Sequence, residues 1–218
     1  MFGAGTVECD LKVRVLIENT AGGMGLIAQH GLSFLLETDT GWRILFDAGQ
    51  SRSALNTNCR LMGIEPEDID AIVISHGHYD HTAGLNWVLP KALDAPVIMH
   101  PDALLPKFSV RQGEPPRYIG IPDRVREKLE EPGRQLHLTD TPTEVAPAVY
   151  FLGQVERKTD FEVIEPRFKA DAMGKEPDRM LDDSALVVRT RKGLVILAGC
   201  AHSGVINMLS HVRRLWRG

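Results

Sequence analysis

Residues 71–84 constrain this chain more than any other segment, because a short apolar run leads directly into a cluster of metal-ligating side chains. Residues 71–75 (AIVIS) predict a strand that is buried on both faces, as in the middle of a covered sheet. Four potential metal ligands follow at once: His76, His78, Asp80 and His81. Imidazole nitrogens and carboxylate oxygens bind zinc, and also iron, manganese or cobalt.

The spacing of these ligands favours a loop over a helix or a strand. A loop at a strand end can turn several neighbouring side chains toward one point, and Gly77 leaves room for the backbone to bend. We therefore predict a loop over residues 75–84. The alternative is a polar loop with chance histidines, but three of the 8 histidines in the chain fall in this motif. A metal site is the favoured interpretation.

The segments on either side predict a mixed α/β chain. Before the motif we predict strands over residues 13–18, 32–38 and 42–47, joined as a meander with a turn at Thr40-Gly41, and a helix over residues 51–62. Ser51 or Ser53 would cap this helix, and Gly63 would follow its end. After the motif, a helix begins near Gly84 and ends at Pro90, and residues 97–100 form a strand.

The second half is less regular until its end. Residues 101–135 contain six prolines and predict an insertion or lid with one short helix over 123–131, capped by Asp123, in a single domain spanning residues 1–218. Residues 153–183 are polar and predict loops. Strands over 184–190 and 194–198 then flank a turn, and a helix runs from Ser203 or Gly204 to about Arg214.

Composition narrows the partners and the compartment. The net charge of −4 weighs against a nucleic-acid partner, and bound divalent cations would offset it. The chain has three widely spaced cysteines, Cys9, Cys59 and Cys200. An odd number at such spacing indicates a reducing compartment rather than a disulfide framework. The N-terminus lacks the pattern of a signal peptide, and no apolar run approaches the length of a membrane span. We expect a cytoplasmic protein without a membrane partner.

The sequence HGHYDH at residues 76–81 resembles the His-x-His-x-Asp-His motif of the metallo-β-lactamase superfamily. The resemblance implies an αββα sandwich in which His76 and His78 hold one metal ion, while Asp80 and His81 hold a second. Three further stretches narrow the resemblance to one branch of the superfamily: residues 30–33 (HGLS), 45–50 (LFDAGQ) and 199–204 (GCAHSG). They are similar to the 7,8-dihydropterin-6-methyl-4-(β-D-ribofuranosyl)aminobenzene 5′-phosphate synthase-like branch.

The implied metal site is completed by a histidine and a cysteine that follow the last predicted strand. In the wider family a later histidine completes the first metal, and His202 is the best remaining candidate in this chain. Its alternative is a polar residue at a helix start. Cys200 stands where the family usually has an aspartate that bridges the metals. It is either a thiolate ligand or a small buried side chain.

Several other residues have a possible role near this site. Asp182 or Asp183 would serve as ligand, base or partner of a histidine, with a turn or cap as the alternative, and we predict Asp80 and Asp183 as catalytic. By resemblance, Asp47 orients a metal-binding histidine; otherwise it is a turn residue. For His30 a surface position is favoured over a place in the pocket, and His100 is undecided.

The number of metal ions that we predict depends on where the chain ends. Members of the branch usually continue beyond the helix that corresponds to residues 205–214, with further strands and another histidine. We therefore expect the C-terminal part of the sandwich, and a ligand for the second metal, to be missing, which leaves one or two ions. An open sheet edge would favour a homodimer.

The function predicted from these features is a metal-dependent hydrolase that acts on a small phosphorylated or pterin-like substrate through metal-bound hydroxide. Zinc is the expected divalent metal, with iron or manganese as alternatives. A Lys or Arg from residues 157–179 would meet the phosphate or carboxylate of the substrate. The alternatives are a phosphodiesterase or nuclease and a non-catalytic metal-binding sensor. A redox diiron site is disfavoured, because the diiron flavoproteins of this superfamily usually carry glutamate at the position of His78.

Overall fold

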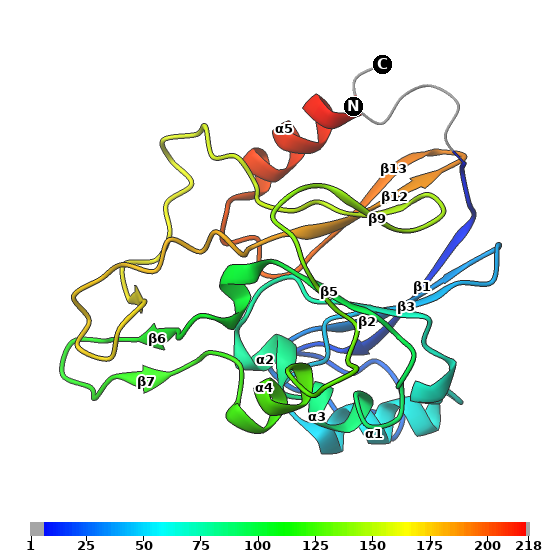
Figure 1. The fold of residues 1–218 in the computed structure, drawn as a ribbon, viewed down its shortest axis with the longest axis horizontal. Helices are drawn as coiled ribbons and strands as arrows, with labels where there is room; N and C mark the ends of the chain where they lie inside the picture. The colour runs from blue at the N-terminus through cyan, green and yellow to red at the C-terminus, as the bar shows by residue number, and fades with distance from the viewer. Residues whose placement is uncertain (1–6, 217–218) are drawn as a thin grey trace.

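Two β-sheets packed face to face form the centre of the computed structural model, which describes residues 7–216 (Figure 1). The first sheet has the strand order β1-β2-β3-β4-β5-β8: β1 (Leu11–Ile17), β2 (Ser33–Thr38), β3 (Arg43–Phe46), β4 (Ala71–Val73), β5 (Val97–Met99) and β8 (Leu136–Leu138). Strands β1 to β3 are antiparallel, and β3, β4, β5 and β8 are parallel. The second sheet is antiparallel, in the order β13 (Gly193–Ala198), β12 (Ala185–Thr190), β10 (Val149–Phe151) and β9 (Thr143–Ala146).

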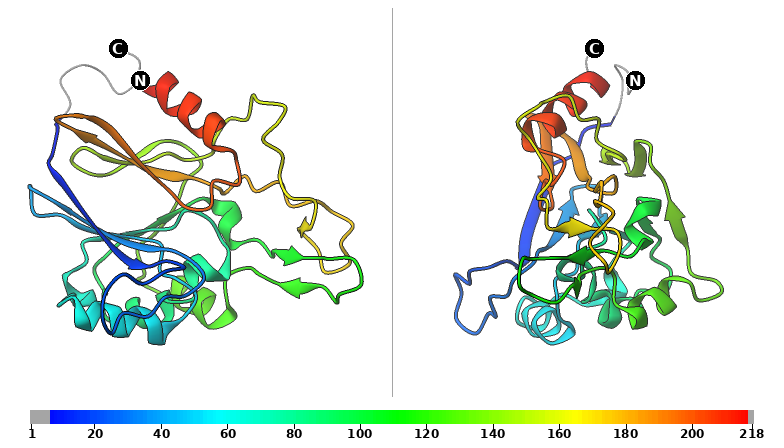
Figure 2. Two further views of the ribbon diagram at one scale, coloured as in Figure 1. Left: turned by 180° about the vertical axis from the view of Figure 1, so that it is seen from behind. Right: turned by 90° about the vertical axis from the view of Figure 1, so that its left-hand side faces the viewer.

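Helices cover the outer face of each sheet (Figure 2). Helices α1 (Arg52–Leu61), α3 (Leu85–Val88) and α4 (Asp123–Leu129) pack on the first sheet, where Leu45 and Ile72 share one buried cluster with Leu55 and Val125. Helix α5 (Val205–Leu215) packs on the second sheet, in a cluster that includes Val187 and Met208. The order helix, sheet, sheet, helix confirms the predicted αββα sandwich.

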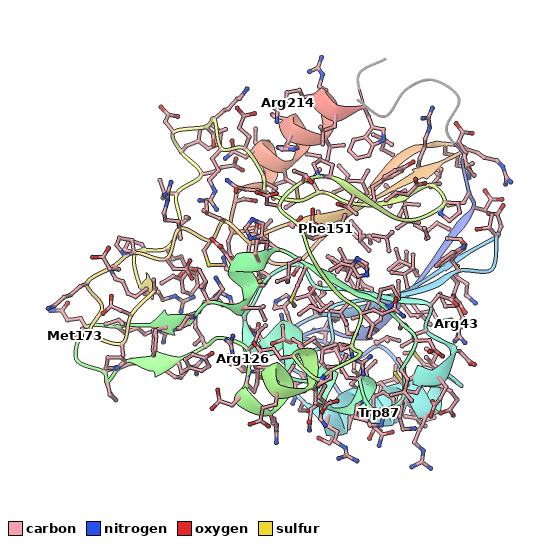
Figure 3. The ribbon with its side chains drawn as sticks, in the orientation of Figure 1. Arg43, Trp87, Arg126, Phe151, Met173 and Arg214 are labelled. Carbon is pink, nitrogen blue, oxygen red and sulfur yellow. The ribbon has the colours of Figure 1, made fainter. Side chains whose placement is uncertain are left out.

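Alternation along the strands builds the core between the sheets. Phe46 and Val73 of the first sheet share a buried cluster with Phe151 and Val188 of the second, and Phe151 lies between the two layers in Figure 3. Trp87 lies in the outer helical layer. Each such side chain contributes about 1.5–3 kcal/mol by leaving water. All three residues of β4 are buried, as predicted for a strand covered on both faces.

Several predicted elements are confirmed and others are wrong. Helix α1 begins after Ser51, whose Oγ accepts from the Ala54 N–H, and Gly63 follows with φ of +66°. The loop predicted over residues 75–84 is wrong in part, because α2 (Tyr79–Thr82) forms a helical turn within it. The Ala83 N–H donates to the Tyr79 carbonyl over 2.8 Å and closes this turn. For α4 the predicted cap Asp123 is also wrong, since Pro122 is the N-cap.

Residues 101–135 are more regular than their prolines predict. A 3₁₀ turn (Pro101–Leu104) precedes a hairpin of β6 (Phe108–Ser109) and β7 (Arg117–Tyr118), and β11 (Phe168–Lys169) pairs with β6 to make a third sheet. Another 3₁₀ turn (Pro66–Asp68) precedes β4. The hairpin projects from one end of the sandwich, beside the segment that carries Met173 (Figures 1 and 3). Within residues 7–216, no helix has the length and apolar character needed to cross a membrane.

Candidate metal centre

The candidate site lies at one end of the sandwich, where both sheets bring their strand ends together. Asp47 follows β3, residues 75–81 follow β4, and Cys200 and His202 follow β13. The two sheets meet at Ser75, whose carbonyl accepts from the Ser184 N–H over 3.0 Å. A Cβ added to Gly199 would lie 2.3 Å from Ser75 Oγ, so this close approach requires glycine. The strand ends therefore place residues far apart in the chain around one point.

Two groups of donor atoms meet at this point. His76, Cys200 and His202 offer ligand atoms that all lie within 4.8 Å of one another. Asp80, His81 and Cys200 form a second group at the same spacing. Cys200 belongs to both groups, as a bridging ligand would.

His78 joins neither group, although it borders both. Its Nδ1 lies 3.0 Å from Nε2 of His76. Its Nε2 is buried and makes no hydrogen bond to any residue in the described range, and the same holds for Nε2 of His202. Buried polar atoms are nearly always satisfied, so these two nitrogens indicate room for a ligand that the protein itself does not supply.

Asp47 holds His81 in place. Its Oδ2 lies 2.6 Å from Nδ1 of His81 and accepts a hydrogen bond from Ser75 Oγ, while Oδ1 accepts from the Ser75 N–H. The same Ser75 Oγ lies 2.9 Å from Nδ1 of His76. Nδ1–H of His81 donates to Asp47, and its Nε2 lies 3.2 Å from Cys200 Sγ, directed at the donor atoms. Asp47 adopts φ of +57°, a conformation that aspartate tolerates better than most residues.

A buried ion pair fixes the backbone between the first two histidines. Asp182 Oδ2 accepts from the Gly77 N–H at 2.8 Å, and its Oδ1 accepts from Lys107 Nζ at 2.8 Å. Lys107 Nζ also contacts Asp178 at 3.2 Å. A Cβ at Gly77 would lie 2.1 Å from the Ala103 carbonyl oxygen, so glycine is needed here for space as well as for bending. Asp182 acts on the site through Gly77 and does not reach the donor atoms.

Asp183 supports the loop that carries His202. Its Oδ2 accepts from the N–H and Oγ of Ser203, while its Oδ1 is buried without a hydrogen bond to the described residues. Burial raises the pKa of Asp183, and the facing His202 opposes that shift. Asp183 is not among the residues that line the cavity, whereas Asp80 is.

A cavity of about 660 Å³ opens beside the donor atoms. His78, Asp80, Cys200 and His202 form its floor, and the hairpin and the segment before β11 form its walls. His30 is exposed, as favoured from the sequence, and it also lines the cavity, with Nε2 3.3 Å from Asp80 Oδ2. The walls carry three arginines and two glutamates: Arg111, Arg117, Arg167, Glu114 and Glu165. His100 does not line the cavity; it is buried and caps the turn at Pro101–Leu104.

The donors differ in how they hold protons. Burial lowers the pKa of His76 far below its ordinary value and that of His78 to about 2. Burial opposes protonation of His81 too, but the Asp47 carboxylate holds its pKa well above the ordinary value. Burial likewise opposes ionisation of Cys200, yet hydrogen bonds with His202 and His81 lower the pKa of the thiol. Burial also opposes protonation of His202, but its hydrogen bond with Cys200 and the charge of Asp183 raise its pKa. The centre therefore offers His76 and His78 as neutral imidazoles beside a stabilised thiolate, whereas His81 and His202 would release a proton when they bind metal.

Comparison with known proteins agrees with this geometry. The sequence profile of the metallo-beta-lactamase superfamily matches residues 27–204. The chain belongs to this superfamily.

Two relatives from Methanocaldococcus jannaschii match nearly the whole chain. One, an uncharacterized protein, is 38% identical over 205 residues, covering 93% of this chain and 74% of the relative. The other is the 7,8-dihydropterin-6-methyl-4-(beta-D-ribofuranosyl)-aminobenzene-5'-phosphate synthase, 31% identical over 221 residues, covering 96% of this chain and 74% of the relative. The second match confirms the branch that the sequence resembles.

Solved structures share the fold at low identity. A Thermotoga maritima protein described as a metallo-beta-lactamase superposes with a TM-score of 0.52 at 14% identity, covering 95% of this chain and 92% of that structure. A quorum-quenching N-acyl homoserine lactone lactonase gives a TM-score of 0.50 at 18% identity, covering 96% of this chain and 86% of that structure.

The sequence indicated most of the donors and the carboxylates that support them, but not the basic residues nearby. Lys107 and the hairpin arginines, Arg111 and Arg117, lie in a segment that we treated as an irregular insertion. Of the basic residues expected from 157–179 to meet a substrate, Arg167 lines the cavity, while Lys169 and Arg179 line a separate hollow. The acidic pair at 182–183 was a usable signal for the support of the metal loop.

Proposed function

We propose that this protein is a metal-dependent hydrolase that acts on a small phosphorylated or pterin-like substrate. The observation that carries this proposal is the double donor set that shares Cys200 and opens on a cavity. The orphaned nitrogens of His78 and His202 fit a metal ion, and the mix of imidazole, carboxylate and thiolate suits zinc. A divalent metal held there would lower the pKa of a coordinated water to about 7 and polarise the electrophile.

The chain's own residues would prepare the reaction. Asp47 and Ser75 would hold the imidazoles of His81 and His76 at fixed angles, so that binding costs little reorganisation. Asp80 lies in the floor of the cavity, 3.3 Å from His30, and would hold a water or a proton beside the substrate. Phe168 lies against the rings of His78 and His202 and would keep bulk water from that side. Asp183 would orient the His202 loop through Ser203 rather than act as a base.

The test is to replace His76 and His78 by alanine. Each variant should lose bound metal, measured by elemental analysis, and lose turnover of phosphate esters and lactones. His137→Ala is the control, since that exposed residue lies in β8, outside the candidate site. Turnover that survives in a variant without metal would contradict the mechanism.

A second candidate is a synthase reaction, which the name of one relative favours at 31% identity. The two candidates differ in what they consume. Product released from one organic substrate and water supports the hydrolase. Product that forms only when two organic substrates are present supports the synthase and excludes hydrolysis as the main activity.

A further inference from the structure

We propose that Arg111, Arg117 and Arg167 form a subsite that binds the phosphate group of a phosphate monoester at the mouth of the cavity. This proposal names the substrate class of the proposed enzyme and rests on the proposed function for the location of the reacting bond. The binding itself needs no metal. It can therefore be tested apart from the reaction.

The register of the third sheet brings these side chains together. Ser109 of β6 pairs with Arg117 of β7 on one side and with Phe168 of β11 on the other. Residues directly opposite one another in a sheet project to the same face, and all three line the cavity. Arg111 and Arg167 lie just outside the paired strands, two residues after Ser109 and one residue before Phe168, and both line the same cavity.

Two of the guanidinium groups lean on aromatic rings that adjoin the metal donors. Arg117 lies 5.4 Å from the ring centre of Tyr79, and its Nη2 lies 3.2 Å from the Tyr79 hydroxyl. Arg167 lies 4.9 Å from the ring centre of Phe168 and pairs with Glu165 at 2.6 Å. Tyr79 stands between two of the motif ligands, and Phe168 contacts His78 and His202. The arginines are thus positioned beside the donors without contacting them.

The charge and shape of this wall favour phosphate over other anions. Within the described part of the chain, the Arg111 side chain makes no hydrogen bond or ion pair with protein. Three guanidiniums face two glutamates on the walls, so the walls carry a net positive charge in an acidic protein. Guanidinium forks match phosphate oxygens, and three of them, two on the hairpin and one before β11, suit a group with three terminal oxygens better than a carboxylate with two. The cavity of about 660 Å³ leaves space for the remainder of a small substrate.

The experiment titrates the metal-free full chain with phenyl phosphate and follows binding by calorimetry. Wild-type protein should bind the monoester, and Arg111→Gln, Arg117→Gln and Arg167→Gln should each weaken binding about tenfold, the loss of one charge-assisted contact. Arg179→Gln is the matched control, because Arg179 is exposed and lines the separate hollow. It should bind as wild type does. Circular dichroism and zinc uptake of each variant check that it is folded.

Two comparison ligands separate the sources of binding. Benzoate tests for a general carboxylate site, and diphenyl phosphate tests for a phosphodiester site. Affinity for either one that equals the affinity for phenyl phosphate would overturn the assignment, and so would equal binding by wild type and all three arginine variants. Loss of turnover in the histidine variants leaves this result unchanged, so the two proposals fail separately.

Discussion

Cys200 is the residue on which the two donor groups depend, because its sulfur is common to both. A thiolate is a softer ligand than the aspartate expected at this place in the family, and it shifts the preference toward zinc over manganese or magnesium. Hydrogen bonds from His81 and His202 stabilise the thiolate before any metal binds. The identity of one atom thus bears on the choice of metal for the whole centre.

We predict that cobalt(II) added to the metal-free protein produces a sulfur-to-cobalt charge-transfer band. Cys200→Ser should remove the band and weaken metal binding about 10–100-fold, because the replacement oxygen does not ionise. The measurement is ultraviolet–visible titration with cobalt, with a competing chelator for affinity. Cys59→Ala is the control, since that thiol is buried in the core and burial raises its pKa to about 12. A band that persists in Cys200→Ser would exclude sulfur ligation at this site.

At the scale of elements, the hairpin segment and the metal loop are tied together. The Tyr79 N–H donates to the Ile119 carbonyl after β7, over 2.9 Å. Lys107, just before β6, bonds Asp182, which holds the Gly77 N–H. The third sheet therefore supports the loop that carries the ligands as well as lining the cavity. A substitution in the hairpin segment should therefore change the metal affinity.

Lys107→Met tests this tie. It leaves the fully buried Asp182 carboxylate without its cation, so we expect a loss of about 3–5 kcal/mol in the free energy of unfolding. Metal affinity should also fall about 10–100-fold as Gly77 loses its fixed position. Denaturant unfolding and chelator competition measure the two effects.

The double variant Lys107→Met/Asp182→Asn separates charge from position. Removing both charges should recover much of the stability, and the asparagine oxygen can still accept from Gly77. Lys169→Met, in β11, is the control and should change neither quantity, because the side chain of Lys169 makes no salt bridge within residues 7–216. Unchanged metal affinity in Lys107→Met would show that the ion pair serves stability alone.

The elements that could be predicted are those whose signal is local. The apolar run of β4 and the motif after it occupy a single segment, and the Ser51 cap and Gly63 mark the ends of α1. Strand β8 (Leu-His-Leu) was missed because, unlike the equally short β4, it forms no apolar run. The roles of Lys107 and Arg117 depend on contacts between residues far apart in the chain: Lys107 with Asp182 across 75 positions and Arg117 with Tyr79 across 38. No local pattern contains that information.

At the scale of the whole molecule, α5 closes the second sheet and is held to the preceding segment by buried polar contacts. Asn207 accepts from the N–H groups of Lys158 and Thr159, and Nδ1 of His211 accepts from the Glu156 N–H at 2.9 Å. Arg214, at the exposed end of this helix in Figure 3, lies 3.3 Å from the same nitrogen and pairs with Glu156. His211 must stay neutral to accept both contacts.

This requirement makes stability depend on pH. Burial, helped by the nearby charges of Arg214 and Lys158 and opposed by Glu156, lowers the pKa of His211 from its ordinary value of 6.5. Below pH 6.5 the unfolded chain therefore binds a proton at His211 that the folded chain does not, and the free energy of unfolding falls as pH falls. One such group contributes at most about 1.4 kcal/mol per pH unit.

We predict that His211→Asn flattens this dependence, because asparagine keeps an acceptor near the Glu156 N–H and does not titrate. At pH 7.5 the variant should be modestly less stable than wild type; between about pH 6.5 and 5.5 the wild type should lose up to about 1.4 kcal/mol more than the variant. Urea unfolding of both metal-free proteins across this range measures the difference, in which contributions from the shared metal-site histidines cancel. Parallel curves would show that protonation of His211 in the folded state costs nothing, and that α5 stays docked without a neutral acceptor at this position.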